Sequence, residues 1–187
     1  MEKNKKLILI TGELAAGKST LAGQMTARYG IPSFTKDRFK ELLCDGVGYS
    51  NRAENLKLSF LTFDLMFHIF ECCAEAEKPL ILESNFRQNE LDRMEKAAAG
   101  YGYETLTVFL TGDLHVLHGR YLARTASGTR HPAHLTQDLS RFEDFEAISC
   151  AKNPRRLFGK IVSIDTTARD AFFDFSGDER IRAFLEQ

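Results

Sequence analysis

A short segment near the start of the chain has residue types and spacing that suit phosphate binding. Residues 12–19 are GELAAGKS, which matches GxxxxGK[ST] at every fixed position. In such a loop, backbone N–H groups and the positive end of the following helix surround phosphate oxygens. Lys18 would reach the outer phosphates, and Ser19 would offer its hydroxyl oxygen to Mg²⁺. The alternative is a glycine-rich turn with a solvated lysine.

The residues around this motif have the order that phosphate binding requires. Residues 6–11 (KLILIT) precede it as a buried strand, and residues 18–29 follow as a helix with apolar side chains at helical spacing. Gly12 and Gly17 allow unusual backbone angles and a close approach to the ligand. The residues predicted to bind nucleotide here are Gly12, Glu13, Leu14, Ala15, Ala16, Gly17, Lys18, Ser19 and Thr20.

Two arginines in the second half of the chain could bind the same phosphates as this loop. Arg120 and Arg124 are four residues apart, so on a helix they share a face and could both reach a triphosphate. Arg130, in a loop bounded by Gly and Pro, could add a third cation. Phosphoryl transfer depends mainly on positioning and on cations at the phosphate oxygens. The alternative is a set of ordinary surface arginines.

The elements that must position these groups alternate along the chain. Apolar runs that predict strands alternate with helix-length amphipathic segments, which favours an α/β fold with a parallel sheet and helices on both faces. The predicted strands are residues 6–11, 31–34, 79–83, 104–110 and 160–165, and the predicted helices are residues 18–29, 53–77, 88–100, 113–126 and 178–187. Residues 44–52 and 127–136 are rich in turn formers and predict surface loops. Phe60, Phe63, Phe67 and Phe70 have the spacing of a core helix.

Composition limits the class of protein. A chain of 187 residues fits one domain, and its net charge of -1, with no basic stripe interleaved with aromatics, disfavours nucleic-acid binding. The longest apolar stretch, residues 56–70, is too short and too often interrupted to span a membrane. The N-terminus does not resemble a secretory signal, and the four cysteines lack CxxC spacing, so we expect reduced thiols and a cytoplasmic location. Oligomeric state does not follow from the sequence.

The phosphate loop alone does not decide between nucleotide-using classes. A guanine-binding NKxD segment is absent from the sequence, and oligomeric ATPases usually need a longer chain. The remaining length suits a small kinase that closes over its nucleotide.

Further motifs resemble those of the P-loop small-molecule kinases. They are TKDR at residues 35–38, LILESNF at 80–86, RYLAR at 120–124 with RHP at 130–132, and IDTT at 164–167. The resemblance spans nearly the whole chain and is to the ATP-binding, AAA-like group that includes chloramphenicol phosphotransferase, zeta-toxin-like and gluconate-kinase-like enzymes. It implies a three-layer P-loop NTPase fold in one domain of residues 1–187. The parallel sheet would have five strands in the order 2-3-1-4-5, with a lid near residues 124–140. It also implies that ATP with Mg²⁺ phosphorylates a hydroxyl.

The resemblance also suggests roles for two acidic residues. Asp37 follows the second strand and would orient and deprotonate the acceptor hydroxyl, while sharing the water shell of Mg²⁺. A helix N-cap is its alternative role. Glu83 resembles the acid that ends the third strand, although many relatives have aspartate there. It could hold a magnesium-bound water or a substrate hydroxyl, or could form a salt bridge. The predicted metal-binding set is therefore Ser19, Asp37 and Glu83.

The remaining predicted site residues would contact the adenine ring or the acceptor. Thr166 and Thr167 occupy the position where relatives hold adenine, mostly through backbone atoms. An acceptor would be bound at the carboxyl edge of the sheet. The predicted substrate-binding residues are Asp37, Arg38, Arg52, Glu83, Asn85 and Arg87.

Three functions remain compatible with these features. The first is an ATP-dependent kinase that phosphorylates a small-molecule hydroxyl. The second is a kinase for a nucleotide sugar or a nucleic-acid 5′-hydroxyl, because Lys36, Arg38 and Lys40, with Arg52 and Arg87, could hold an anionic acceptor. The third is a nucleotide-switched ATP-binding protein without useful turnover.

Overall fold

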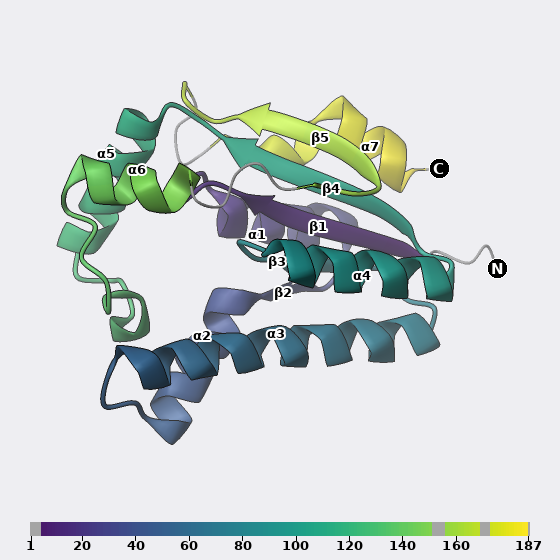
Figure 1. The fold of residues 1–187 in the computed structure, drawn as a ribbon. Coiled ribbons are helices and arrows are strands. Elements are labelled where there is room, and N and C mark those ends of the chain that lie inside the picture. Colours follow the sequence, from purple (N-terminus) through teal and green to yellow (C-terminus); the bar gives the residue numbers. More distant parts are fainter. Residues whose placement is uncertain (1–4, 151–155, 169–172, 187) are drawn as a thin grey trace.

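The sheet at the centre of the molecule has five parallel strands in the order β2-β3-β1-β4-β5. The computed structural model describes residues 5–150, 156–168 and 173–186. The strands are β1 (Lys6–Gly12), β2 (Ser33–Thr35), β3 (Leu80–Glu83), β4 (Glu104–Thr111) and β5 (Lys160–Asp165). The predicted fold class, strand order and all five strands are confirmed, although β2 begins two residues later than expected. The carboxyl ends of the strands meet at one edge, at the left of Figure 1.

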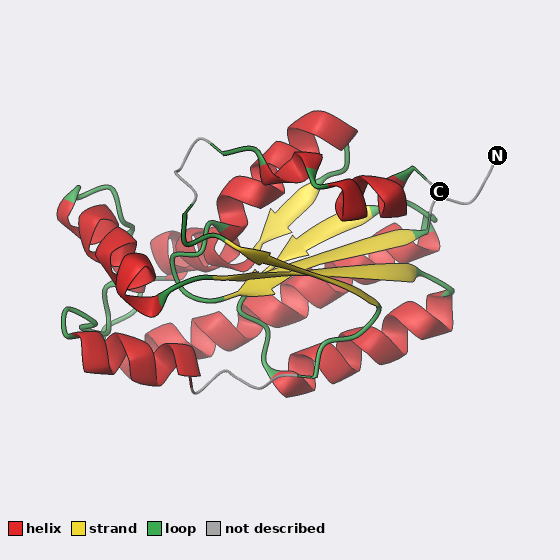
Figure 2. Cartoon of the chain, turned by 90° about the horizontal axis from the view of Figure 1, so that it is seen from above, coloured by secondary structure: helices red, strands yellow, loops and turns green. Residues whose placement is uncertain are grey.

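Helices cover both faces of the sheet, which gives three layers (Figure 2). β1 is buried along its whole length because its side chains alternate between two cores. Ile8 and Ile10 pack in the core that includes α1 (Lys18–Tyr29) and α5 (Leu114–Ala126). Leu7 and Leu9 pack in the other core, against α3 (Arg52–Glu75) and α4 (Gln88–Tyr101). Burial on both faces explains the continuous apolar sequence of this strand.

The helices largely follow the sequence pattern, with two additions. α1 has the predicted bounds. The ends of four further helices differ by at most two residues from the prediction, namely α3, α4, α5 and α7 (Glu179–Leu185). α2 (Lys36–Val47) extends into the segment predicted as a loop, so only the second half of residues 44–52 is irregular. α6 (Phe142–Cys150) was not predicted. Short 3₁₀ helices occupy Pro132–His134 and Phe175–Gly177.

The segment between α5 and α6 forms the arm at the left of Figure 1, and we call residues 127–141 the lid. The lid lies against α2 and α3 through polar contacts. Lys40 Nζ and Asn55 Nδ2 donate to the Ala133 carbonyl at 3.0 and 3.2 Å. His131 Nε2 lies 3.0 Å from Asp45 Oδ1. The lid therefore joins the two sides of the carboxyl edge.

α3 is less buried than its sequence suggests. Phe63, Phe67 and Phe70 lie in the core, but Phe60 is 48% exposed, and Leu56, Leu61 and Leu65 also reach the surface. The four phenylalanines span a wider part of the helix surface than the face that packs on the sheet, and Phe60 lies outside that face. The prediction that Phe60 belongs to the core is therefore wrong.

The structure also bears on the thiols and on membrane spans. Cys44, Cys72 and Cys73 are free thiols. Within the described ranges, no helix combines the length and the apolar character of a membrane span.

Candidate active site

The phosphate loop connects β1 to α1 with a backbone that requires glycine. Gly12 has φ of +135°, and a Cβ atom there would lie 2.0 Å from the Leu110 carbonyl oxygen of β4. Gly17, at the N-cap of α1, has φ of 89°. Ala15 also has a positive φ, 59°, which is uncommon for a residue with a side chain. The loop thus needs glycine at two positions, and it leads into the N-terminus of α1, where the first N–H groups have no helical acceptors.

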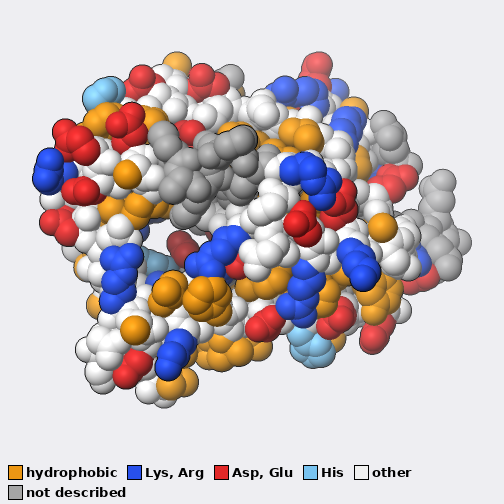
Figure 3. Space-filling model, in the orientation of Figure 1, with side chains coloured by type: hydrophobic (Ala, Val, Ile, Leu, Met, Phe, Trp, Pro, Cys, Tyr) orange, Lys and Arg blue, Asp and Glu red, His pale blue; other side chains and the backbone are white. Residues whose placement is uncertain are grey.

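Lys18 lies folded over this loop. Its Nζ donates to the Glu13 carbonyl at 2.6 Å, and the side chain lines the large cavity at the carboxyl edge of the sheet. The cavity has a volume of about 660 Å³. Figure 3 shows the hollow between the α5–α6 arm and the α2–α3 side, with Lys and Arg side chains at its rim and an acidic side chain inside it. The volume is in the range of small-molecule sites.

Ser19 and Glu83 meet at the floor of the cavity. Ser19 Oγ donates to Glu83 Oε2 at 2.9 Å, and Glu83 is only 5% exposed. Glu83 reaches this position because β3 pairs with β1 in register, with Glu83 opposite Ile10. Burial raises the pKa of Glu83 to about 7, against the opposing effects of Lys18 and of the Ser19 hydrogen bond. The carboxylate is therefore poised to accept a nearby cation.

These oxygen atoms fit a hard divalent cation. Mg²⁺ prefers oxygen ligands, and in nucleotide sites one or two carboxylates and the phosphates usually hold it. A buried carboxyl group with a raised pKa, already bonded to the serine of the phosphate loop, is a suitable donor set. Ser19 and Glu83 are therefore the residues that would hold Mg²⁺ directly or through water.

Asp37 lies across the cavity from the phosphate loop. It is in the first turn of α2, whose N-cap is Thr35, so the alternative of an N-cap role for Asp37 is wrong. Its side chain is 71% exposed and lines the cavity. His134 of the lid approaches it, with Nδ1 4.0 Å from Oδ1. Asp37 is thus free to contact a ligand.

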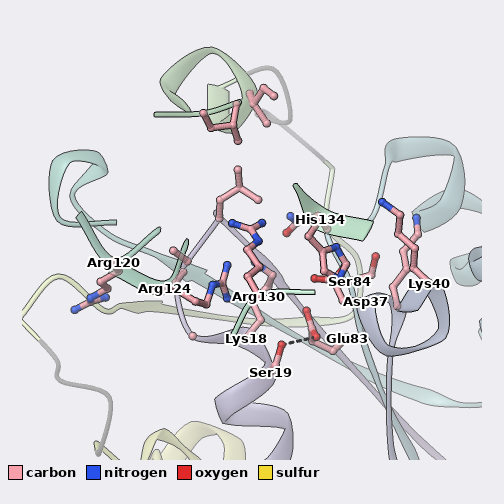
Figure 4. Close-up of a pocket in the computed structure, with 18 of the residues that line it drawn as sticks. Lys18, Ser19, Asp37, Lys40, Glu83, Ser84, Arg120, Arg124, Arg130 and His134 are labelled. Carbon is pink, nitrogen blue, oxygen red and sulfur yellow. Dashed lines mark hydrogen bonds and ion pairs between the residues drawn. The ribbon is translucent and has the colours of Figure 1, made fainter. Parts of the chain in front are cut away.

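The predicted arginines do not converge on one point. Arg124 and Arg130 lie beside Lys18, whereas Arg120 lies apart from them (Figure 4). Arg120 Nη2 donates to the Thr166 carbonyl at 2.8 Å, and Nη1 lies 3.3 Å from Thr166 Oγ1. Both arginines line the cavity, but their side chains diverge in this structure, and phosphate contacts of the pair stay a prediction. Being on one helical face did not suffice, because the end of β5 supplies carbonyl acceptors for Arg120.

Thr166 and Thr167 have different positions. Thr166 lines the cavity but is 1% exposed, and its Oγ1 donates to the Thr111 carbonyl at 3.0 Å. Thr167 does not line the cavity, and its Oγ1 accepts from the Asp113 N–H at 2.7 Å. Both hydroxyls therefore hold the end of β5 to the β4–α5 connection.

The predicted acceptor residues divide into two groups. Glu83, Asn85 and Arg87 line the cavity with Asp37. Arg38 instead pairs with Glu41 at 3.2 Å and lines a smaller neighbouring pocket. Arg52 donates to Gln137 Oε1 at 2.9 Å and does not line the cavity. The structure therefore does not bring Arg38 and Arg52 into the main cavity.

Sequence reasoning left the cavity residues Ser59, Ser84, His134, Thr136 and Gln137 out of the site, and it named Lys36 and Lys40 only for the alternative of an anionic acceptor. Two of them had a usable signal. Lys40 lies one helical turn after Asp37, and Ser84 directly follows the strand-terminal Glu83. The lid residues had none, because their position depends on how the lid lies against α2.

Comparison with known proteins agrees with this geometry. A family model described as an AAA domain matches residues 7–145. A solved protein of Chloroflexus aurantiacus, named as a candidate kinase, is 27% identical. It has a TM-score of 0.79, with 98% of this chain and 96% of that chain covered. No curated protein matches significantly.

Two further structures share the fold at lower identity. Shikimate kinase from Bacteroides thetaiotaomicron is 21% identical, with a TM-score of 0.57 and coverage of 97% and 98%. The APS kinase CysC of Mycobacterium tuberculosis, solved with AMPPNP and APS, is 16% identical, with a TM-score of 0.52 and coverage of 98% and 96%. From the family match and these similarities, the chain belongs to the AAA-domain family and to the P-loop small-molecule kinase superfamily.

Proposed function

We propose that the protein is an ATP-dependent kinase that transfers the γ-phosphoryl group to a hydroxyl group of a small molecule. One observation carries the proposal: a single cavity is lined by the phosphate loop with Lys18 on one side and by the exposed carboxylate of Asp37 on the other. A passive nucleotide binder needs the loop but not the carboxylate. A kinase needs both, within one enclosed space.

The nucleotide end would bind and orient ATP. The loop N–H groups and Lys18 would hold the outer phosphates, and Arg124 and Arg130 would approach them from α5 and the lid. Ser19 and Glu83 would hold Mg²⁺, which neutralises charge on the phosphates when it is bound. Arg120 would act indirectly, by fixing Thr166 at the wall of the cavity.

Asp37 would act on the acceptor. Its carboxylate would accept a hydrogen bond from the acceptor hydroxyl and take the proton as the hydroxyl oxygen bonds to the γ-phosphorus. The bond from that phosphorus to the β,γ-bridging oxygen breaks, and ADP leaves with the electron pair. The lid lies at this end of the cavity through its contacts with α2 and α3, and its closure over the acceptor would favour a small acceptor over a polymer.

The experiment is ADP release by the purified protein with Mg²⁺ and ATP across a panel of hydroxylated compounds. The panel contains antibiotics, sugars, sugar acids, nucleosides, nucleotide sugars and 5′-hydroxyl oligonucleotides. We expect one small-molecule class to raise the rate far above the water background. Stimulation by oligonucleotides alone would favour the nucleic-acid alternative. ATP binding without stimulation by any compound would favour the switch alternative.

A further inference from the structure

The end of the cavity away from the phosphate loop has a charge pattern that the transfer reaction does not explain. We call this end the acceptor chamber and define it by Asp37, Lys40, Ser84, Asn85, Arg87 and His134, all of which line the cavity. These residues come from α2, from the loop after β3 and from the lid. The nucleotide end has its own cations, so those of the chamber need another partner.

Of the five basic residues that the sequence offers for an anionic acceptor, two have no carboxylate partner and line the cavity, namely Lys40 and Arg87. Lys36 pairs with Glu90 at 3.1 Å, and both side chains are nearly buried. Arg38 and Arg52 lie outside the cavity, as described above. Neither Lys40 nor Arg87 forms an ion pair with a carboxylate in the described part of the chain.

Lys40 is held in place by a hydrogen bond and forms no ion pair in the described part of the chain. Its Nζ donates to the Ala133 carbonyl at 3.0 Å, which leaves two of its three donors for other partners. Burial lowers the pKa of Lys40, and Asp37 is the main acidic group that opposes this effect. Asp37 is assigned to the acceptor hydroxyl, so an anionic ligand would supply the missing stabilisation.

Arg87 is also oriented without a carboxylate. Its guanidinium lies over the ring of Phe60, 4.3 Å from the centroid. A cation–π contact of this kind helps to place the guanidinium and uses none of its N–H donors on a carboxylate, and those donors suit a carboxylate or phosphate ligand. Phe60, which is 48% exposed, thus has one face covered by Arg87.

Two polar groups that also line the chamber lack partners among the residues that the structure describes. Ser84 is 2% exposed and its Oγ has no hydrogen bond there, and Asn85 Oδ1 is likewise buried without one. Buried polar atoms are nearly always satisfied, and an unsatisfied one costs about 1–3 kcal/mol. Because Asn85 Oδ1 can only accept, its partner must be a donor such as a ligand hydroxyl.

From these features we propose that the acceptor is a small hydroxylated anion. Its carboxylate or phosphate group is bound by Lys40 and Arg87, and its hydroxyl groups by Ser84 and Asn85. That this anion is a phosphoryl acceptor rests on the proposed kinase function. The preference for binding an anion rests on the chamber residues alone. It excludes acceptors that carry no negative charge.

The first experiment compares charged acceptors with uncharged ones of the same carbon skeleton. The probes are an aldonic acid, a uronic acid and a sugar monophosphate, each beside its alditol or free sugar, in the ADP-release assay. We expect the preferred charged compound to exceed its uncharged counterpart at least tenfold in kcat/KM. The carboxylate and phosphate arms identify which anion is bound. A preferred acceptor without charge would overturn the inference.

The second experiment tests the two cations with matched controls. Lys40→Met and Arg87→Met should each raise the KM for the charged acceptor about tenfold or more and leave the KM for ATP nearly unchanged. Arg93→Met is the control for Arg87, because Arg93 also stacks on a phenylalanine, Phe67, but does not line the cavity. Lys57→Met, at an exposed position of α3, is the control for Lys40. An unchanged ratio of charged to uncharged acceptor in both cavity variants would overturn the inference.

A binding measurement separates this inference from the kinase proposal. The thermal unfolding midpoint of the protein, saturated with a non-hydrolysable ATP analogue, is followed with each compound. A rise with an acid but not with its uncharged counterpart, lost in Lys40→Met, supports the inference even if no compound is phosphorylated. In that case only the kinase proposal fails. No rise with any acid, or an equal rise with both members of a pair, contradicts the inference.

Discussion

The phosphate loop at the nucleotide end of the cavity is one contiguous segment, whereas the acceptor chamber combines residues from α2, the β3–α4 loop and the lid. Residues 12–20 carry the phosphate loop, and β1 and α1 on either side of it are packed into the core. The chamber instead depends on contacts between residues about 90 positions apart, such as Lys40 with Ala133. A local motif can therefore specify the first site, but only the complete fold can specify the second.

The two ends also differ in what stabilises them. The phosphate loop is fixed by buried strands, whereas the lid lies on α2 and α3 through hydrogen bonds and partly exposed ion pairs. Such contacts contribute about 0.5–1.5 kcal/mol each, or less when exposed. We therefore expect the phosphate loop to be rigid and the lid to open and close during turnover.

The largest expected effect is at the nucleotide end. Lys18→Ala should reduce both ATP affinity and phosphoryl transfer, by at least about 100-fold in kcat/KM, because Lys18 is the cation that belongs to the loop itself. Calorimetric ATP binding and ADP release would measure the two effects. Normal binding and normal turnover in this variant would remove the basis for the phosphate-loop assignment.

A glycine in each region tests the difference in rigidity. Gly12→Ala should destabilise the protein by more than about 3 kcal/mol, because the new Cβ would overlap the Leu110 carbonyl in a positive-φ conformation. Gly128→Ala in the lid also has positive φ, but a Cβ added there would point into open space, with no neighbouring atom within 4 Å among the described residues. It should cost only about 1 kcal/mol. Chemical denaturation would measure both, and equal losses would contradict the proposed difference.

Glu83 should make both activity and stability depend on pH. Because its pKa is raised from 4.5 to about 7, the folded protein retains a proton that the unfolded chain loses. The ligand-free protein should therefore lose stability as the pH rises from 4.5 to 7, by up to about 3 kcal/mol, and Glu83→Gln should remove this slope. The kcat/KM, which reports the free enzyme, should change in the opposite direction and fall below pH 7, as the carboxylate is protonated. A wild-type stability slope equal to that of Glu83→Gln would contradict the assignment.

The smallest expected effect is at the lid. His131→Ala removes the contact with Asp45 and should raise the KM of the acceptor about two- to threefold, with global stability changed by less than about 0.5 kcal/mol. His68→Ala is the control, because His68 is an exposed histidine that lies 3.8 Å from Glu71 on the same helix. Steady-state kinetics and thermal unfolding would measure these changes. A large loss of stability in His131→Ala would show that the lid is part of the rigid core.

The sequence predicted the parts of this molecule that depend on local patterns. The strands were recognisable because a strand buried on both faces is continuously apolar, and α1 because the phosphate loop fixes its start. α6 was missed because its position depends on tertiary contacts, including the stacking of Phe142 on His115 with ring centroids 3.9 Å apart. The hydrogen bond of Arg120 to Thr166 was not foreseen, because its acceptor lies just after β5, 46 residues away. Side chains that are positioned across the fold leave no periodic signal.

The most direct test of the account is the Asp37→Asn variant, measured for ATP binding and for phosphoryl transfer to the acceptor that the panel identifies. Asp37 belongs to the acceptor side of the cavity, so the account predicts an ATP dissociation constant within about twofold of the wild type and a kcat reduced by at least about 100-fold. Full transfer activity in Asp37→Asn would contradict the account and would move the base to another residue.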